Sequence, residues 1–203
     1  MKAVKAQEQQ YTFEEYCDFE EKSAIKYEFR NGKIMIMSGG TTDHATIIGN
    51  LYLYLRLGLK LLPNKCYALN SENKIFIKAI NEGFYPDGGI VIGQRDFYKK
   101  DKAITNPAVI FEVLSDSTGN YDRGDKFRKY KLLPSFQEYI LIEQDQPVID
   151  VLSKNKNGKW EMETFIGLDD VLKLNTIDIS IKLSDLYEDV ENLHLPQTKI
   201  DLD

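Results

Sequence analysis

The stretch that decides the fold is VIFEVLSDST, residues 109–118. Its first six residues are apolar except for Glu112, and a short apolar run of this kind predicts a strand buried on both faces. An ionised carboxylate in an apolar interior is unfavourable unless it is paired, bound to a metal or protonated. Glu112 therefore requires a partner, which is either structural or catalytic.

The composition indicates one globular domain. The chain has 203 residues, of which 42% are hydrophobic and 29% are charged, enough for a substantial core. Its two cysteines have no metal-ligand spacing and indicate no disulfide scaffold. The N-terminus lacks an apolar signal core, and the most apolar run contains Arg56 and Lys60. We therefore expect a cytoplasmic protein that does not enter the membrane.

Charge is distributed unevenly along the chain. The net charge is −6, which argues weakly against a nucleic-acid partner. Residues 1–131 contain 20 Lys and Arg against 17 Asp and Glu, whereas residues 132–203 contain 6 against 15. The acidity lies in the C-terminal third, and the remainder has room for a basic surface.

Local signals predict early helices and strands throughout the chain. Thr12 and Glu15 form a capping box that opens a helix, and the Asn31-Gly32 pair predicts a hairpin turn. A long helix is expected within residues 39–62. Further strands are expected at CYALN, NKIFIK, IVI, EYILIE, PVIDVLS, WEMETFI and IDISIKL. This order predicts an α+β domain around one mixed sheet.

Two acids on neighbouring segments form the candidate site. Asp87 precedes one predicted strand, in YPDGGIVI, and Glu112 lies inside another. Two carboxylates that converge from adjacent strands favour a divalent cation, and Mg²⁺ typically takes one or two carboxylates with waters and substrate phosphates. Such a pair supplies part of a metal site suited to the hydrolysis of phosphodiester bonds. In the alternative interpretation, Asp87 is a turn residue after Pro86, and Glu112 pairs with a lysine or arginine.

A third candidate lies on the helix predicted after residue 118. A spacing of about 100° per residue places Arg123, Lys126, Tyr130 and Leu133 on one stripe that faces the core. Lys126 then points toward the sheet, where it can position or deprotonate a water and stabilise negative charge on a phosphate. Alternatively, Lys126 extends past the core to water or is itself the ion-pair partner of Glu112. Lys129 is the reserve candidate.

Two weaker candidates complete the set. His44 lies on the apolar side of its helix, where a core or capping histidine is the more common explanation. Glu28 lies between Tyr27 and Phe29, and the alternation favours a strand residue that faces solvent over a third acid near the metal.

Several chemistries find no support in the sequence. The chain has two histidines, His44 and His194, too few for a histidine-rich zinc site. No GxGxxG or GxxxxGK[ST] motif occurs, and Ser115 lacks a GxSxG nucleophile elbow.

The ordered segments YPDGGIVI, NPAVIFEVLSDST and DRGDKFRKYKLLPSFQEYILIE resemble the Uma family of restriction endonucleases. The family pattern has Pro-Asp before a strand, a strand EVLSPST, a helix D-x-x-x-K-x-x-x-Y and an aromatic EYW strand. The likeness extends over about residues 11–188. Asp116 stands here where proline is usual, and Ile140 where tryptophan is usual.

The resemblance implies the PD-(D/E)xK nuclease fold, a mixed sheet flanked by helices, here with additional C-terminal antiparallel strands. It implies that Asp87 and Glu112 bind Mg²⁺, with Mn²⁺ as a substitute, and that the backbone carbonyl of Val113 is a further candidate ligand. The lysine that the superfamily has two residues after the acid is Leu114 here, and Lys126 is its natural replacement.

We therefore expect a single nuclease-like domain over residues 1–190 and a polar tail over residues 191–203. Its expected activity is Mg²⁺-dependent hydrolysis of DNA, with Asp87, Glu112 and Lys126 as catalytic residues. The supporting residues are Glu28, His44 and Tyr130. The alternative is an inactive nuclease-like domain that binds nucleic acid or protein. Exposed strand edges also predict a homodimer.

Overall fold

The computed structural model of the protein describes residues 10–37, 39–99, 102–115 and 119–195. Asp116 therefore lies outside the described residues. The fold is α+β, as predicted. Its helical elements are α1 (Phe13–Glu20), α2 (Thr42–Leu59), α3 (Gly119–Tyr121), the π-helical turn η1 (Asp122–Lys126), α4 (Phe127–Tyr130) and α5 (Leu183–Leu186).

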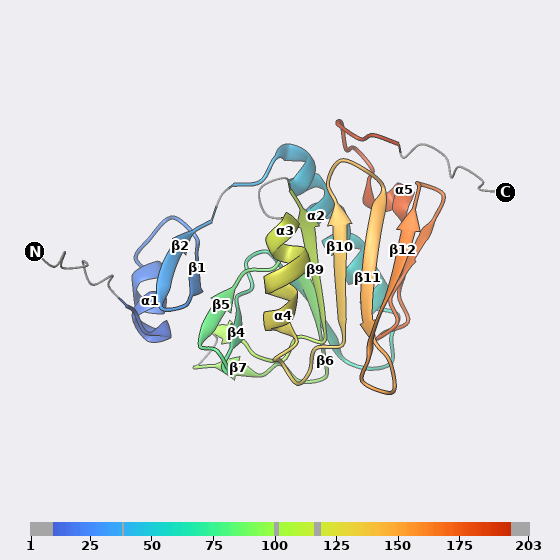
Figure 1. Cartoon of the computed structure of the whole chain (residues 1–203). Coiled ribbons are helices and arrows are strands. Elements are labelled where there is room, and N and C mark those ends of the chain that lie inside the picture. The colour runs from blue at the N-terminus through green and yellow to red at the C-terminus, as the bar shows by residue number, and fades with distance from the viewer. Residues whose placement is uncertain (1–9, 38, 100–101, 116–118, 196–203) are drawn as a thin grey trace, which may run out of the picture.

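A six-stranded mixed sheet forms the centre of the molecule (Figure 1). In spatial order its strands are β12 (Trp160–Ile166), β11 (Val148–Lys154), β10 (Glu138–Glu143), β9 (Val109–Leu114), β6 (Gly88–Ile92) and β3 (Cys66–Asn70). β9 and β10 are parallel, and the other neighbours are antiparallel. The segment that opened the sequence analysis is therefore a central strand, which explains why it is apolar on both faces.

Alternate residues of β9 pack on opposite layers. Val109, Phe111 and Val113 belong to the core that includes the buried face of α2. Ile110 and Leu114 belong to a second core, which includes Tyr130 of α4 and residues of a second sheet described below. Because side chains alternate along a strand, Glu112 faces the second core. Figure 1 shows α2 behind the central sheet and α3–α4 in front of it.

A second six-stranded sheet departs from the expectation of one sheet. Its order is β2 (Lys33–Ile36), β1 (Tyr27–Arg30), β5 (Glu82–Phe84), β4 (Ile75–Ile77), β8 (Ala103–Ile104) and β7 (Phe97–Tyr98). A separate hairpin joins β13 (Val171–Lys173) to β14 (Ser180–Lys182). The chain passes between the two sheets several times, and Pro86, which has no N–H to donate to a ladder, lies at the passage from β5 to β6.

The local signals hold in the structure. Thr12 and Glu15 form both hydrogen bonds of the capping box at the start of α1. Asn31 and Gly32 have positive φ, 50° and 74°, and join β1 to β2 as the Asn-Gly pair predicts. Thr41 caps α2 through the His44 N–H.

Two further findings concern the ends and surfaces of the fold. Within the described part of the chain, no helix has the length and apolar character needed to cross a membrane. The first two residues of the predicted tail bind the core, since the N–H groups of Glu191 and Asn192 donate to the Asp43 carboxylate. Residues 196–203 lie outside the described part.

Candidate functional site

The candidate site lies where β9 extends beyond the start of β6. The antiparallel register pairs Gly88 with Phe111, and extending it by one residue places Asp87 opposite Glu112. Among the described residues no strand continues the ladder on that side, so the main chain of Val113 finds side-chain partners instead. Asp87 Oδ2 accepts a hydrogen bond from the Val113 N–H at 2.8 Å. This contact holds Asp87 beside the strand that carries Glu112.

His44 reaches the same place from the first turn of α2. Its Nε2 lies 3.2 Å from the Val113 carbonyl oxygen and 3.4 Å from Asp87 Oδ2. Burial lowers the pKa of His44, but the hydrogen bond to Asp87, the charge of Asp87 and the Val113 carbonyl together outweigh it and raise the pKa above its ordinary value. His44 is therefore half-buried among the predicted site residues and contacts two of them.

Glu112 has the partners that its burial requires. The side chain is only 2% exposed, and its Oε1 lies 2.8 Å from Lys126 Nζ and 3.1 Å from the Tyr130 hydroxyl, which donates to it. Burial raises the pKa of the Glu112 carboxyl well above its usual range; Lys126 opposes this, while Asp122 and Asp87 add to it. The ion pair that was the structural alternative for Glu112 is thus present, within a larger cluster.

Lys126 lies at the centre of that cluster. Its Nζ is 2.8 Å from Glu112, 3.2 Å from Asp122 and 3.9 Å from Glu28. Burial disfavours the ammonium ion, but these carboxylates outweigh it and raise the pKa of Lys126. Lys126 is therefore protonated at neutral pH. An ammonium ion held among carboxylates suits charge stabilisation on a phosphate.

The position of Glu28 corrects a sequence interpretation. The alternation placed this residue in solvent, yet it is 3% exposed and binds Arg30 Nε at 2.7 Å. Its apolar neighbours Tyr27 and Phe29 predicted that Glu28 faces solvent. This prediction was wrong because both faces of β1 are covered. Phe29 packs against α1, and the Arg30 guanidinium lies 4.1 Å from the ring centroid of Tyr121, next to η1.

Asp122 is a site residue that sequence reasoning missed. It is 4% exposed and lies four residues before Lys126, within the π-helical turn η1. π-Helical turns are rare and occur frequently at functional sites. The acid-before-lysine spacing was the available signal, since such pairs lie on one helix face. The turn also alters the predicted stripe, because Arg123 is exposed and pairs with Glu143 and Asp150.

These side chains share one cavity of about 550 Å³. Its charged lining comprises Glu28, Arg30, Asp87, Glu112, Asp122 and Lys126. Four carboxyl groups thus face two permanent cations, and with Glu112 protonated three carboxylates still face those two, so the cavity keeps an excess of negative charge that a divalent cation would neutralise.

The donor set fits Mg²⁺ in part. Within the residues described, no group of three His, Cys, Asp or Glu side chains is placed to hold a metal by side chains alone. Asp87, Glu112 and the Val113 carbonyl supply oxygen donors at the cavity, and Mg²⁺ commonly completes its shell with waters and phosphate oxygens.

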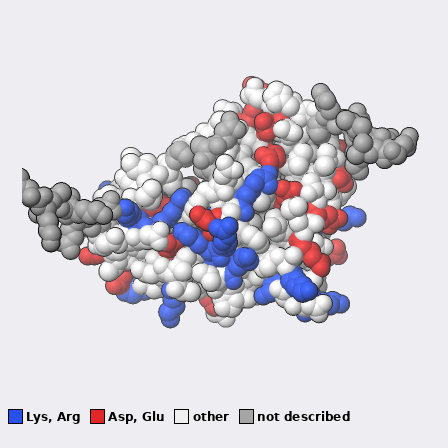
Figure 2. Space-filling view, viewed as in Figure 1, with Lys and Arg blue, Asp and Glu red and all other residues white. Residues whose placement is uncertain are grey.

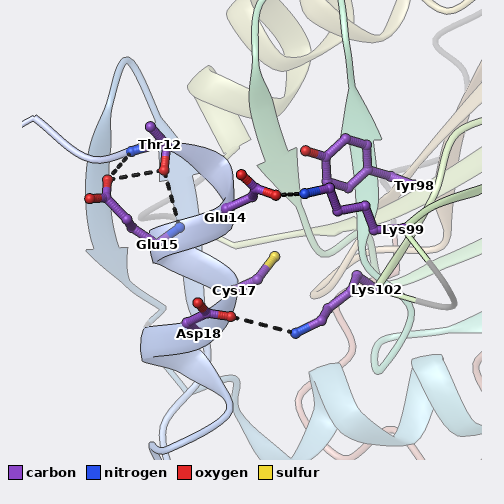
Figure 3. A pocket seen from close by; sticks show the side chains of 8 residues that line it. All are labelled: Thr12, Glu14, Glu15, Cys17, Asp18, Tyr98, Lys99 and Lys102. Atoms are coloured by element: carbon purple, nitrogen blue, oxygen red, sulfur yellow. Dashed lines mark hydrogen bonds and ion pairs between the residues drawn. The ribbon is translucent and has the colours of Figure 1, made fainter.

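A second cavity of about 620 Å³ lies between α1 and the β7–β8 region (Figure 3). Its charged side chains pair across the opening: Lys99 with Glu14, and Lys102 with Asp18 at 3.8 Å. The sulfur of Cys17 is the remaining reactive group, and burial raises the pKa of that thiol. The paired charges indicate a structural contact between α1 and this segment.

Two other positions were considered for the catalytic lysine, Lys129 and Leu114, and both residues have structural roles. Lys129, the reserve candidate, binds Glu82 at 2.6 Å instead of the acids of the site. Leu114, at the position of the superfamily lysine, is buried in the second core. Of the two candidate lysines, Lys126 is the one that meets Glu112.

Comparisons with known proteins identify a family and two relatives. The family model Uma2, described as "Putative restriction endonuclease", matches residues 13–184. The chain is 34% identical over 174 residues to the uncharacterized protein slr1290 of Synechocystis sp., covering 86% of this chain and 90% of that protein. It is 30% identical over 157 residues to sll1609 of the same organism, covering 77% and 88%.

A solved structure shares the fold. It is described as a "putative nuclease belonging to DUF820" from Anabaena variabilis, with a TM-score of 0.68 and 17% identity, covering 87% of this chain and 97% of that one. The family description supports a nuclease-like function. Since the family model spans residues 13–184, well over half of the chain, this protein belongs to the Uma2 family of restriction-endonuclease-like proteins.

Proposed function

We propose that the protein is a Mg²⁺- or Mn²⁺-dependent endonuclease that hydrolyses DNA phosphodiester bonds. The observation that carries this proposal is the cavity in which Asp87, Glu112 and the Val113 carbonyl lie together, with more carboxylates than cations. Asp87, Glu112 and Val113 are the proposed metal ligands. A bound divalent cation supplies Lewis acidity at the phosphate and a more acidic water.

The residues around the ligands have separate roles in this proposal. The Lys126 ammonium stabilises the negative charge that develops on the phosphate when water adds and the P–O bond to the leaving oxygen breaks. Glu28 and Asp122 hold Lys126 in place through its ion pairs. Tyr130 fixes one oxygen of Glu112 by donating a hydrogen bond to it.

DNA as the substrate has support from the surface beside the cavity. Figure 2 shows Lys and Arg side chains gathered over α3–α4. Arg123 and Arg128 are exposed there and Lys131 follows them, although Arg123 and Arg128 also pair with nearby acids. Exposed cations next to a hydrolytic site are suited to phosphate backbones.

The test is an endonuclease assay on supercoiled, linear and single-stranded DNA with Mg²⁺ or Mn²⁺. We expect cleavage by the wild type and a loss of at least about 100-fold in Asp87→Asn, Glu112→Gln and Lys126→Met, the effect typical of removing one charge-stabilising group. Arg56→Gln, on the opposite side of the central sheet, is the control. Metal-independent cleavage, or full activity of Asp87→Asn, would contradict the proposal.

A second candidate is a nuclease-like domain that binds nucleic acid or protein without cleavage. The observation that favours it is the engagement of Lys126 with three carboxylates, together with Leu114 at the usual lysine position. DNA retention by the wild type, without cleavage in either metal, would support this candidate.

The single domain over residues 1–190, the cytoplasmic location and the homodimer stay predictions. One cooperative unfolding transition would support the single domain, and sedimentation at micromolar protein concentration would determine whether the chain pairs with itself.

A further inference from the structure

The imidazole of His44 contacts two of the proposed metal ligands with one nitrogen. Nε2 lies 3.2 Å from the Val113 carbonyl oxygen and 3.4 Å from Asp87 Oδ2. Both distances lie near the separation of neighbouring donors in an octahedral shell, about 3 Å when each metal–donor bond is about 2.1 Å. Nε2 thus lies at about ligand spacing from each of the two oxygens.

The fold holds the ring in this position. His44 belongs to the first turn of an 18-residue helix, and its own N–H donates to the capping Thr41 hydroxyl at 3.1 Å. Farther along α2, Leu51 and Leu55 anchor the helix in the core. A Cβ atom added at Gly40 would lie 2.6 Å from His44 Nδ1, so the glycine leaves space that the ring needs.

We propose that His44 is a metal ligand, which binds the divalent cation through Nε2 together with Asp87 Oδ2 and the Val113 carbonyl oxygen. This inference rests on the proposed function, since it assigns a further ligand to the same site. The neutral imidazole binds through the Nε2 lone pair and keeps its proton on Nδ1. When the metal binds, the proton that Nε2 donates in the metal-free protein passes to solvent, and the metal bond replaces that hydrogen bond.

A nitrogen donor changes the metal preference of the site. Mg²⁺ is a hard cation that favours oxygen donors, whereas imidazole suits first-row transition metals. The protein is therefore expected to bind Mn²⁺ more tightly than Mg²⁺, and the difference depends on His44.

The test is pulsed electron paramagnetic resonance of Mn²⁺ bound to the full-length protein without DNA, which detects nitrogen nuclei bonded to the metal. We expect ¹⁴N coupling in the wild type, its replacement by ¹⁵N coupling after labelling of histidine with ¹⁵N, and its loss in His44→Ala. His194→Ala is the matched control, because the chain has two histidines and His194 lies far along the sequence on an exposed segment. The labelling arm requires no variant to fold.

Calorimetric titration of the same proteins gives the second readout. The ratio of Mn²⁺ to Mg²⁺ affinity is expected to fall at least about tenfold in His44→Ala, the lower end of the effect of removing even an outer-sphere partner. Gly40→Ala, which crowds the ring, is expected to lower the ratio less.

The outcomes separate the two proposals. Mn²⁺ binding that Asp87→Asn abolishes, but without histidine coupling in the wild type, would overturn the His44 assignment and leave the proposed function intact. Histidine coupling that persists in His44→Ala would also overturn it. A wild-type protein that binds neither Mn²⁺ nor Mg²⁺ would overturn both.

Discussion

Within the described part of the chain two lysines are buried, Lys74 and Lys126, and their surroundings differ. Lys74, 8% exposed, pairs with Glu20 and lies 4.4 Å from the centroid of the Tyr16 ring. Glu20 also accepts hydrogen bonds from the Tyr16 and Tyr85 hydroxyls, so one cation meets one satisfied carboxylate. Lys126, 6% exposed, meets three carboxylates and borders a cavity.

The difference separates a structural cluster from a candidate active site. A buried pair whose charges balance and whose lone pairs are occupied leaves no reason for a further ion. A cluster with surplus carboxylates beside a cavity is incomplete until a cation arrives, and perturbed groups in such a cavity indicate function. Burial alone does not distinguish the two lysines; the count of acids and the access to a cavity do.

The largest effect is expected from Lys74→Met. Removal of this cation leaves Glu20 buried without a counter-charge, which costs about 3 kcal/mol in the free energy of unfolding. Urea denaturation with and without Mn²⁺ measures the loss, and we expect Mn²⁺ to restore none of it. Recovery of this stability in Mn²⁺ would indicate that the metal binds beside Lys74 and Glu20, which contradicts the account.

Lys126→Met is the matched change at the other lysine. Without metal, a loss of about 2 kcal/mol is expected, the cost of an unsatisfied buried group, because the raised pKa of Glu112 lets that acid take up a proton. Saturating Mn²⁺ should narrow the gap to wild type, because metal binding displaces the proton from Glu112 and supplies the positive charge that Lys126 no longer provides; the gap narrows to the extent that the variant binds Mn²⁺ more tightly than the wild type. Equal losses with and without Mn²⁺ would contradict the comparison.

Neutral substitutions of Glu112 and Glu20 are expected to have smaller effects on different quantities. The change at Glu112 acts on Mn²⁺ affinity, and the change at Glu20 acts on stability. Glu112→Gln is expected to change the metal-free unfolding free energy by less than about 1 kcal/mol, because its burial already disfavours the charge, and to weaken Mn²⁺ binding at least tenfold. Glu20→Gln is expected to lower stability by about 2 kcal/mol, since it breaks an ion pair, and to leave Mn²⁺ affinity unchanged. Calorimetry measures the Mn²⁺ affinity of both variants, and denaturation measures their free energy of unfolding. Equal changes of both quantities in the two variants would contradict the distinction between the two clusters.

The smallest effects concern single hydroxyls. Tyr85 donates to Glu20 at 3.0 Å and Tyr130 donates to Glu112 at 3.1 Å. Each change to phenylalanine should cost about 1 kcal/mol of stability. Only Tyr130→Phe is expected to lower DNA cleavage, because it releases one oxygen of a proposed metal ligand. An activity loss confined to Tyr85→Phe would reverse the assignment of the two clusters.

Helix caps, tight turns and apolar strands could be predicted from the sequence, because each depends on residues that are close together in the chain. The Thr12 capping box, the Asn31-Gly32 turn and the apolar strand around Glu112 each depend on neighbouring residues, and each is present. The expectation that Lys126 meets Glu112 also holds, since helical spacing and the buried strand leave few other directions.

Tertiary packing explains what the sequence did not predict. Glu28 alternates like a solvent-facing strand residue, and it is buried because the segment α3–η1 covers its strand. Asp122 joins Lys126 through a π-helical turn that a regular helical spacing does not anticipate. The division of the strands into two sheets likewise depends on long-range pairing, since the chain passes between the sheets several times.

The central claim is that the cavity of Asp87 and Glu112 holds a divalent cation. A crystal of the protein soaked in Mn²⁺ tests it through the anomalous signal of the metal. The account predicts one strong peak in this cavity, about 2.1 Å from an oxygen of Asp87, and none beside Lys74 and Glu20. A crystal with saturating Mn²⁺ that shows no peak in the cavity would contradict the account.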